Sequence, residues 1–311
     1  MKSAVLAVLF LLAVSCAQPS FDDSTFSILT YNAYLLFDDT VDGDEYFPFT
    51  KDGGYDGDKY RKRISLTSSA LMSMDATLIV LEEIESEKVI IDLINAGLYK
   101  SGYKYYGFID TDIPISVAFI SKIPVNSVSV HSLDGMRPVL EVNLDFRSDS
   151  ITVYALHAPS RLGGSDAEEK RRELFEYISF LLSSSDSLAI AAGDFNEDAG
   201  KSSLISIPSS GFDSPLYVTE DEGEVSSSVF FCPTVSSFYA GTYFYEDKWY
   251  FFDNIIFTSH AFDDSMLEYQ GTVIYDNPPY TDSYGRPQKY DIKTNSGYSD
   301  HLAVKVIFRY N

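Results

Sequence analysis

The chain has 311 residues, of which 45% are hydrophobic, enough apolar material for a sizeable core, so a mainly disordered chain does not fit this composition. The formal net charge of −23 gives no long-range attraction for a polyanion. Salt screens charges beyond about 10 Å, so the charge close to a binding site decides what binds there.

Residues 1–16, MKSAVLAVLFLLAVSC, have the features of an export signal: one Lys, an apolar run too short to span a bilayer comfortably, and small residues before Cys16. The end of this segment resembles the lipobox of bacterial lipoproteins, with Ala13 where that motif usually has Leu. We therefore expect a signal peptide at 1–16, a tether at 17–25, and a lipid on Cys16 that anchors the exported protein to the envelope membrane. The alternative is ordinary cleavage near Ala17 or Gln18 and secretion.

From residue 26 onward there is no repeat and no Pro/Gly/Ser-rich linker, so we expect one domain at 26–311, acting as a monomer. Its predicted elements follow from hydrophobic periodicity and turn residues. In chain order they are a strand at 27–37, a helix at 58–74, a strand at 76–84, a helix at 86–102, strands at 103–110, 115–122, 125–133, 138–146 and 151–158, a helix at 166–185, a strand at 187–195, strands within 241–259, and strands at 271–276 and 301–310. Many strands with few helices predict two packed sheets covered by helices.

Polar side chains recur where an apolar strand ends. Asp194 and Asn196 follow the run AIAAG, and side chains two residues apart on a strand point to the same face. The same pattern places Asn32, Glu83, His157, Asp253, Asp300 and His301 at the ends of other strands. A single such residue is more simply explained as a loop opening, but the set together favours a shared site.

In their order along the chain these motifs resemble the endonuclease/exonuclease/phosphatase superfamily, whose best-known member is the pancreatic-type deoxyribonuclease. TYNAY at 30–34 looks like the first strand motif of that family, and LIVLEEI at 78–84 is similar to its Leu-Gln-Glu motif with Glu82 in the Gln place. GDFNED at 193–198 and SGYSDHLAV at 296–304 match without change. The stretches 157–164 and 241–259 look like the secreted bacterial branch of the family.

The resemblance implies an α/β (α+β) four-layer sandwich of two mixed sheets flanked by helices, with the site at one rim. It also implies hydrolysis of phosphodiesters with Mg²⁺ or Mn²⁺ as cofactor. Glu83 would be the main metal ligand, with help from Asn32, Asp300 or Asp194, because hard cations prefer oxygen ligands. Asn32 would also contact substrate.

The same resemblance implies the roles of the catalytic residues. His301 would act as general base or orient the attacking water, with its tautomer fixed by Asp253. Asp194 and Asn196 would position water and a phosphate oxygen, and His157 would donate to the phosphate or the leaving group. A Glu upstream pairs with the equivalent of His157 in the deoxyribonuclease.

This chain offers only Asp110 or Asp112 as an acidic partner for that histidine. Pro114 and Ile115 replace the Arg-Gly pair that usually follows the acidic residue in the bacterial branch.

Basic residues are scarce, but Arg137 and Arg161 lie beside the motifs and are candidate substrate-binding residues, as are Lys289 and Lys293. They could line a local positive groove, or they could simply be solvated on an acidic surface. The aromatic run 243–252 fits a sandwich core, although rings at a rim could stack on a base or a lipid headgroup.

The sequence leaves three functions open. The first is an exported or surface-anchored nuclease acting on DNA or RNA. The second is a phosphatase or a phospholipase C-type enzyme of the same superfamily, with sphingomyelin or inositol phosphates as substrates, because fold does not fix substrate. The third is a non-catalytic surface lipoprotein.

The lipid anchor gives a first prediction. If Cys16 carries a lipid, Cys16→Ala moves the protein from the detergent phase to the aqueous phase in a detergent partition experiment, because the acyl chains supply the membrane affinity. A wild-type protein that partitions into water, with an N-terminus after Cys16, contradicts the anchor.

Overall fold

The computed structural model describes residues 5–10, 24–43, 45–197, 216–234, 239–262 and 267–311. The helices are α1 Gly57–Met74, α2 Glu87–Ala96 and α3 Gly164–Ser183. The strands are β1 Val5–Phe10, β2 Thr25–Leu36, β3 Leu78–Ile84, β4 Tyr105–Asp110, β5 Ser116–Ser121, β6 Val125–His131, β7 Val139–Phe146, β8 Asp149–His157, β9 Leu188–Asp194, β10 Tyr217–Thr219, β11 Val229–Phe231, β12 Tyr243–Tyr245, β13 Lys248–Tyr250, β14 Asp253–Phe257, β15 Leu267–Ile274 and β16 Val304–Tyr310.

Most strands belong to two seven-stranded mixed sheets. The first sheet has the order β1-β4-β5-β3-β2-β16-β15, and β2 runs parallel to β3. The second has the order β10-β11-β14-β9-β8-β7-β6, and β8 runs parallel to β9. β12 and β13 form a separate hairpin.

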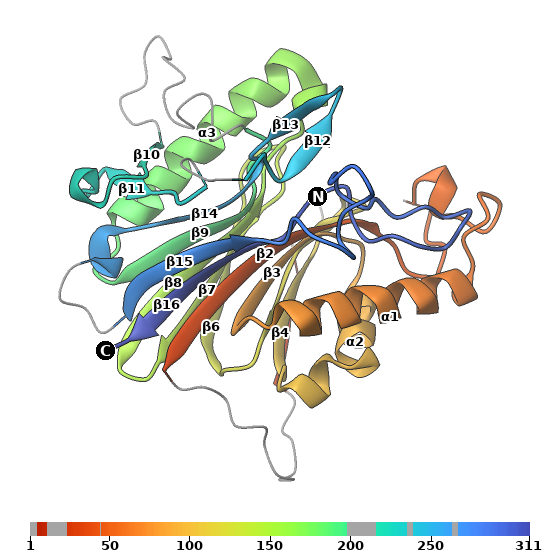
Figure 1. Cartoon of the computed structure of the whole chain (residues 1–311), viewed down its shortest axis with the longest axis horizontal. Coiled ribbons are helices and arrows are strands. Elements are labelled where there is room, and N and C mark those ends of the chain that lie inside the picture. Colours follow the sequence, from red (N-terminus) through yellow and green to blue (C-terminus); the bar gives the residue numbers. More distant parts are fainter. Residues whose placement is uncertain (1–4, 11–23, 44, 198–215, 235–238, 263–266) are drawn as a thin grey trace.

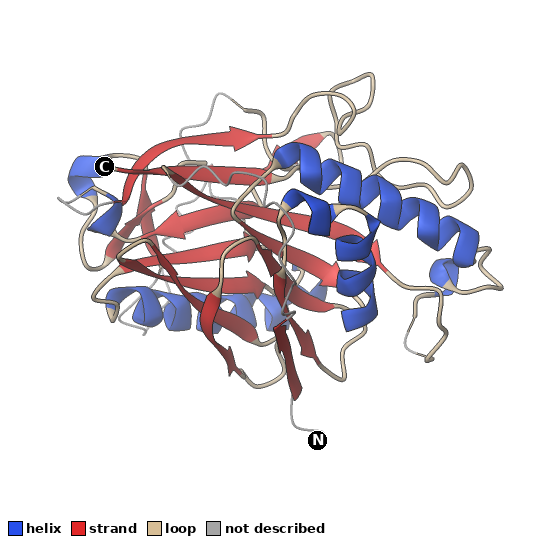
Figure 2. Cartoon of the chain, turned by 90° about the horizontal axis from the view of Figure 1, so that it is seen from below, coloured by secondary structure: helices blue, strands red, loops and turns tan. Residues whose placement is uncertain are grey.

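The two sheets pack face to face around one apolar core. Ile28 and Val80 of the first sheet share a buried cluster with Val153 and Ile190 of the second. On the outer faces, α1 and α2 cover the first sheet and α3 covers the second (Figures 1 and 2). This arrangement confirms the predicted four-layer α/β sandwich.

The apolar runs of the sequence follow from burial of both strand faces. In β2, Ile28 packs in the core between the sheets, whereas its neighbour Leu29 packs under the helices. α1 begins after Asp56, whose side chain accepts hydrogen bonds from the first backbone N–H groups of the helix.

Several elements differ from their predicted bounds. The helix expected at 86–102 ends at Ala96, and a short 3₁₀ helix, Leu98–Ser101, follows it. Gly97 at the break passes so close to Met72 that a Cβ atom would lie 2.8 Å from that side chain. β16 begins at Val304 rather than at residue 301, which leaves Asp300 and His301 in the preceding loop.

The segment expected to be an export signal contains β1, which pairs antiparallel with β4. Cleavage before Cys16 would remove β1 and leave β4 as the edge of the first sheet, whereas Cys16 itself lies outside the described residues. No helix in the described part of the chain is long and apolar enough to cross a membrane.

The close approach of β8 and β9 gives a second prediction. A Cβ atom on Gly193 would lie 1.9 Å from the carbonyl oxygen of Leu156, next to the paired residues His157 and Asp194. Gly193→Ala should lower the free energy of unfolding by about 1–3 kcal/mol, because the strands must separate. Urea denaturation measures the loss. Gly271→Ala is the control, since its Cβ meets no atom within 4 Å, and equal stability of the two variants would refute the steric explanation.

Candidate active site

The predicted site residues come from both sheets and meet at one rim of the sandwich. β2, β3 and the loop before β16 supply Asn32, Glu83, Asp300 and His301 from the first sheet. β8, β9 and β14 supply His157, Asp194 and Asp253 from the second sheet, and Asn196 follows β9. The side chains of Asn32 and Asp194 join the two groups through a 3.1 Å hydrogen bond.

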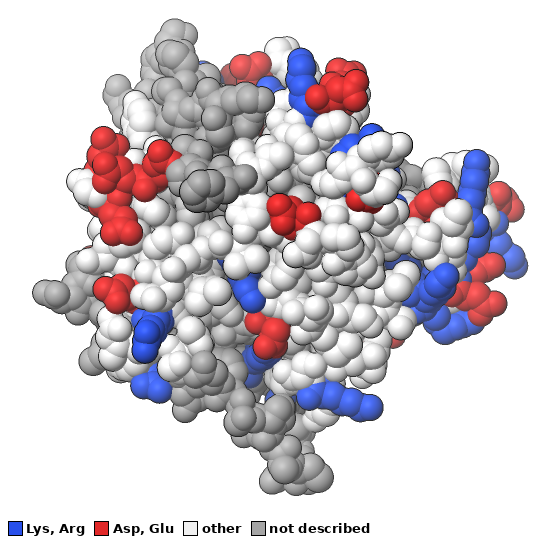
Figure 3. Space-filling model, viewed as in Figure 1, with Lys and Arg blue, Asp and Glu red and all other residues white. Residues whose placement is uncertain are grey.

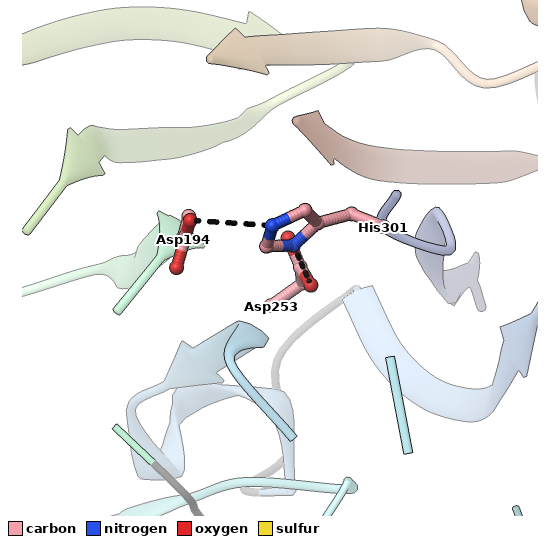
Figure 4. Close-up of side chains that lie close together, drawn as sticks. All are labelled: Asp194, Asp253 and His301. Carbon is pink, nitrogen blue, oxygen red and sulfur yellow. Dashed lines mark hydrogen bonds and ion pairs between the residues drawn. The ribbon is translucent and has the colours of Figure 1, made fainter. Parts of the chain in front are cut away.

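His301 lies between two buried carboxylates (Figure 4). Its Nδ1 atom is 2.8 Å from Oδ2 of the fully buried Asp253, and its Nε2 atom is 4.0 Å from Oδ2 of Asp194. Burial alone would lower the pKa of His301, but the charges of Asp253, Asp194 and Asp300 outweigh burial and raise this pKa well above its ordinary value. Asp253 therefore fixes the tautomer of the ring and stabilises its protonated form.

Asp194 is held by hydrogen bonds to both of its oxygens. Oδ1 accepts from the backbone N–H of Asn196 at 2.8 Å, and Oδ2 accepts from Asn32. Burial raises the pKa of Asp194 to about 7; Asp253 and Glu83 add to the rise, and His301 opposes it. At neutral pH this carboxyl group is therefore divided between its two protonation states.

Glu83 is oriented by the chain reversal at residues 33–35. Its Oε2 atom accepts from the backbone N–H of Leu35 at 2.7 Å, and its Oε1 atom accepts from Asn32 at 3.2 Å. Burial raises the pKa of Glu83, and the nearby charge of Asp300 raises it further. The two hydrogen bonds fix the orientation of the Glu83 carboxyl group, and its surroundings disfavour the ionised form.

Arg63 of α1 holds this chain reversal in place. The sequence motifs gave no indication that Arg63 has this role. Its buried guanidinium donates to the backbone carbonyls of Leu35 at 2.8 Å, Ala33 at 3.2 Å, and Tyr34. A charged residue among the apolar positions of the helix 58–74 was the available signal. The three carbonyls accept from Nη1 and Nη2, so the buried cation is held without a carboxylate, while its Nε atom has no hydrogen-bond partner among the described residues.

Backbone strain is concentrated at the same place. Tyr34, Leu35, Glu83 and Asn196 have φ values of 52°, 48°, 61° and 50°, in the left-handed region that non-glycine residues rarely adopt. Each such residue costs about 1–3 kcal/mol, and it persists only where the surrounding contacts hold it. The contacts of Arg63 and Glu83 provide that support.

Glu82 lies beneath the site and is fully buried. Oε1 accepts from the hydroxyl of Thr30 at 2.7 Å, while Oε2 has no hydrogen-bond partner among the described residues. Burial raises the pKa of Glu82 well above its ordinary value, and the charges of Asp253 and Asp194 add to this rise. A protonated Glu82 is neutral, as is the Gln that the family motif carries at this position.

His157 has no acidic partner of the kind expected. Its Nε2 atom lies 3.6 Å from Asp194, whereas its buried Nδ1 atom has no hydrogen-bond partner in the described part of the chain. The exposed Asp110 and Asp112, between which the sequence did not decide, make no hydrogen bond to this ring. Burial lowers the pKa of His157 well below its ordinary value, with help from Arg137 and His301, so the imidazole is neutral.

These residues open into a pocket of about 420 Å³, here called the catalytic pocket. It is lined by Tyr34, Leu35, Tyr46, Glu83, Ile115, Arg137, His157, Ser160, Arg161, Leu162, Asp194, Asn196, Tyr243, Tyr245, Glu246, Tyr250, Phe252, Asp300 and His301. Both predicted arginines are in this lining. Asn32 and Asp253 lie behind it, so Asn32 orients neighbouring groups in this structure.

The β12–β13 hairpin forms one wall of the catalytic pocket. The ring of Tyr243 lies 4.6 Å from that of His301, and Tyr243 stacks on Phe252 at 5.2 Å. Arg161 lies 5.7 Å from the ring of Phe252. The run 243–252 was expected mainly in the sandwich core, but its residues 243–251 are partly or fully exposed in and beside this hairpin, and only Phe252 is buried.

The donor set suits a hard divalent cation. Glu83, Asp194 and Asp300 all line the catalytic pocket, and a bound cation would offset the excess negative charge that raises the pKa of Glu83. Asp194, Asp253 and His301 also place ligand atoms within 4.8 Å of one another. A protonated His301 repels a cation, so Glu83 and Asp300 are the better candidate ligands.

Comparison with known proteins gives the same fold. The family model described as Endonuclease/Exonuclease/phosphatase family matches residues 27–309. A sequence search of curated proteins found no match.

Similar solved structures include humanized D. rerio TDP2, with 14% identity, TM-score 0.58, and coverage of 92% of this chain and 99% of that one. D. rerio TDP2 complexed with single strand DNA product has 14% identity, TM-score 0.54, and coverage of 92% and 100%. An AP endonuclease from Archaeoglobus fulgidus has 13% identity, TM-score 0.53, and coverage of 92% and 99%. At these identities the likeness concerns the fold.

The raised pKa values give a third prediction. Asp194, with a pKa of about 7, is partly protonated at neutral pH, and a cation binds the ionised carboxylates, so Mg²⁺ binding at pH 7 should release protons. Calorimetry in buffers with different ionisation enthalpies measures this release. It should fade at alkaline pH, where Asp194 is already ionised, and Asp194→Asn should reduce it. Mg²⁺ binding without proton release at pH 7 would contradict the described electrostatics.

Proposed function

The chain belongs to the endonuclease/exonuclease/phosphatase family, and from this premise we propose that it is a divalent-metal-dependent phosphodiesterase that cleaves strands of DNA or RNA. The observation that carries the proposal is His301, held between Asp253 and Asp194 in a pocket that also contains Glu83. This arrangement combines a proton acceptor, its orienting carboxylate and candidate metal ligands.

His301 is the residue that accepts the proton of the attacking water. With Nδ1 bonded to Asp253, its Nε2 atom faces Asp194 and the pocket, where it can take the proton of an attacking water. Asp253 stabilises the imidazolium that results. Of the carboxylates that raise the pKa of His301, Asp300 is also a candidate metal ligand, so a cation held there would offset part of that rise.

The other groups act on the phosphate. A divalent cation held by Glu83 and Asp300 would neutralise charge on the phosphate and on the leaving oxygen. Arg137 and Arg161 line the pocket and can bind nonbridging oxygens through charge-assisted hydrogen bonds. The neutral His157 donates a hydrogen bond, and Asn196 helps to position the phosphate.

A nucleic-acid substrate must be reconciled with the charge of −23. On the face shown in Figure 3, the Lys and Arg residues of the described chain are interspersed with Asp and Glu. Local cations at the catalytic pocket therefore have to supply the attraction. The structure of D. rerio TDP2 complexed with single strand DNA product shows that a protein of this fold can hold a single strand.

A phospholipid or inositol-phosphate diester is the second candidate. The observation that favours it is the apolar mouth of the catalytic pocket, where Leu162 is 88% exposed and Tyr245 is 48% exposed. A lipid on Cys16 would hold the protein at a membrane, and we include export and anchoring in the proposal.

Assays against DNA, RNA, bis(nitrophenyl) phosphate and sphingomyelin distinguish the candidates. EDTA should abolish turnover, and Mg²⁺ or Mn²⁺ should restore it, because the donor set is oxygen-rich. Full activity in EDTA would refute the metal requirement, and no turnover on any diester would leave a non-catalytic lipoprotein.

A fourth prediction concerns the pair His301 and Asp253. His301→Ala should remove most of kcat, and Asp253→Asn should be severely impaired while it stays folded, because it changes only the charge and one hydrogen-bond direction. The double variant should be little worse than His301→Ala, since residues that act as a unit are strongly non-additive. Kinetics at saturating Mg²⁺, with circular dichroism for folding, measure the cycle. Additive losses would mean that the two residues act independently.

A further inference from the structure

A second cavity, of about 640 Å³, adjoins the catalytic pocket and is here called the side cavity. It is lined by Tyr34, Leu35, Tyr46, Pro48, Phe49, Gly53, Lys289, Tyr290, Asp291, Ile292 and Lys293. Tyr34, Leu35 and Tyr46 line both spaces, so the two adjoin at the chain reversal at residues 33–35. The side cavity is not needed for the proposed proton transfer.

The side cavity combines aromatic faces with cations. Lys289 lies 4.1 Å from the centre of the Tyr34 ring and donates to Asp300 at 3.0 Å, so it connects the side cavity with the candidate metal ligands. Tyr46, which lines both spaces, is 43% exposed. An aromatic ring with an accessible face and neighbouring cations suits a flat, anionic ligand.

Lys293 is the cation of the side cavity that is available to a ligand. Its side chain is exposed, and within the described residues its ammonium group makes no hydrogen bond or ion pair. The neighbouring carboxylate of Asp291 accepts from the backbone N–H of Lys293 at 2.7 Å. An anion that enters the side cavity therefore finds a cation that does not have to give up another partner.

Arg63 contacts both walls of the side cavity. Arg63 lies 4.3 Å from the ring of Tyr290 and 5.3 Å from that of Phe49, while its guanidinium binds the carbonyls of the chain reversal. The loops at 46–53 and 289–293 are thus attached to the same residue that supports Glu83. A ligand binding in both spaces meets walls that are fixed relative to each other.

We propose that the side cavity binds the nucleotide next to the scissile phosphate of a single-stranded nucleic acid. Its base stacks on Tyr46, and its phosphate meets Lys293. This rests on the proposed function and narrows its substrate to an unpaired strand longer than a dinucleotide. A paired base cannot offer its face to a protein ring, whereas an unpaired base can.

The first test compares kcat/KM for a DNA dinucleotide, a tetranucleotide and a tetranucleotide with abasic sites. The wild type should prefer the tetranucleotide that carries bases. Tyr46→Leu should reduce the preference for the base-bearing over the abasic tetranucleotide by about 5- to 150-fold, the range for loss of one stacked base, and Tyr46→Phe should retain it. Tyr99→Leu is the control, since Tyr99 is a similarly exposed tyrosine that lines neither cavity.

The second test measures binding without turnover. In the His301→Ala background with Mg²⁺, fluorescence anisotropy of a labelled tetranucleotide gives its affinity at several salt concentrations. Lys293→Gln should weaken binding and lower the slope of log affinity against log salt by about 0.7, as expected for one phosphate contact of a single strand. Lys62→Gln, an exposed lysine of α1 that lines neither cavity, should bind like the parent.

The outcomes separate this inference from the proposed function. DNA cleavage without a length preference, or Lys293→Gln binding like Lys62→Gln, would overturn the side-cavity assignment and leave the phosphodiesterase intact. Equal use of the abasic and base-bearing tetranucleotides would also overturn it, as would Lys293-dependent hydrolysis of inositol phosphates or sphingomyelin in preference to DNA. No turnover on any diester, with tetranucleotide binding that depends on Tyr46 and Lys293, would refute the proposed function and support the side cavity.

Discussion

Asp253 belongs to the second sheet and His301 to the loop before β16 of the first, and the 2.8 Å hydrogen bond between them links the two sheets at a point where Asp253 is fully buried. A buried carboxyl group without a partner is costly, so the hydrogen bond to His301 is what makes a buried Asp253 tolerable. The bond fixes one nitrogen of the ring and turns the other toward Asp194. The geometry of the catalytic pocket therefore depends on how the two sheets pack.

The site contains more negative charge than its own cations offset. Burial and mutual repulsion raise the pKa of Asp194 to about 7 and also raise that of Glu83. Left-handed backbone at Tyr34, Leu35 and Asn196 adds strain, which the contacts of Arg63 and Asp194 hold in place. Charge repulsion and backbone strain lower the stability of a fold. Both are typical of sites where a bound ligand or metal offsets the excess charge.

Periodicity and motif order were sufficient to predict the sandwich and to identify the residues that meet at its rim. The apolar runs around Asn32 and Asp194 required strands buried on both faces, and those strands end at one edge. The role of Arg63 could not be predicted in this way, because it depends on three carbonyls brought together by a chain reversal. The unpaired Nδ1 atom of His157 likewise depends on tertiary packing.

The central claim is that a hard cation binds at Glu83 while His301 remains part of a proton network with Asp253. A crystal structure with Mn²⁺, with the metal located from its anomalous scattering, tests this directly. We predict one ion within bonding distance of a Glu83 oxygen, with the hydrogen bond between His301 and Asp253 intact. An ion bound instead to Nε2 of His301 and the carboxylates of Asp194 and Asp253, or none in the catalytic pocket, would contradict the account.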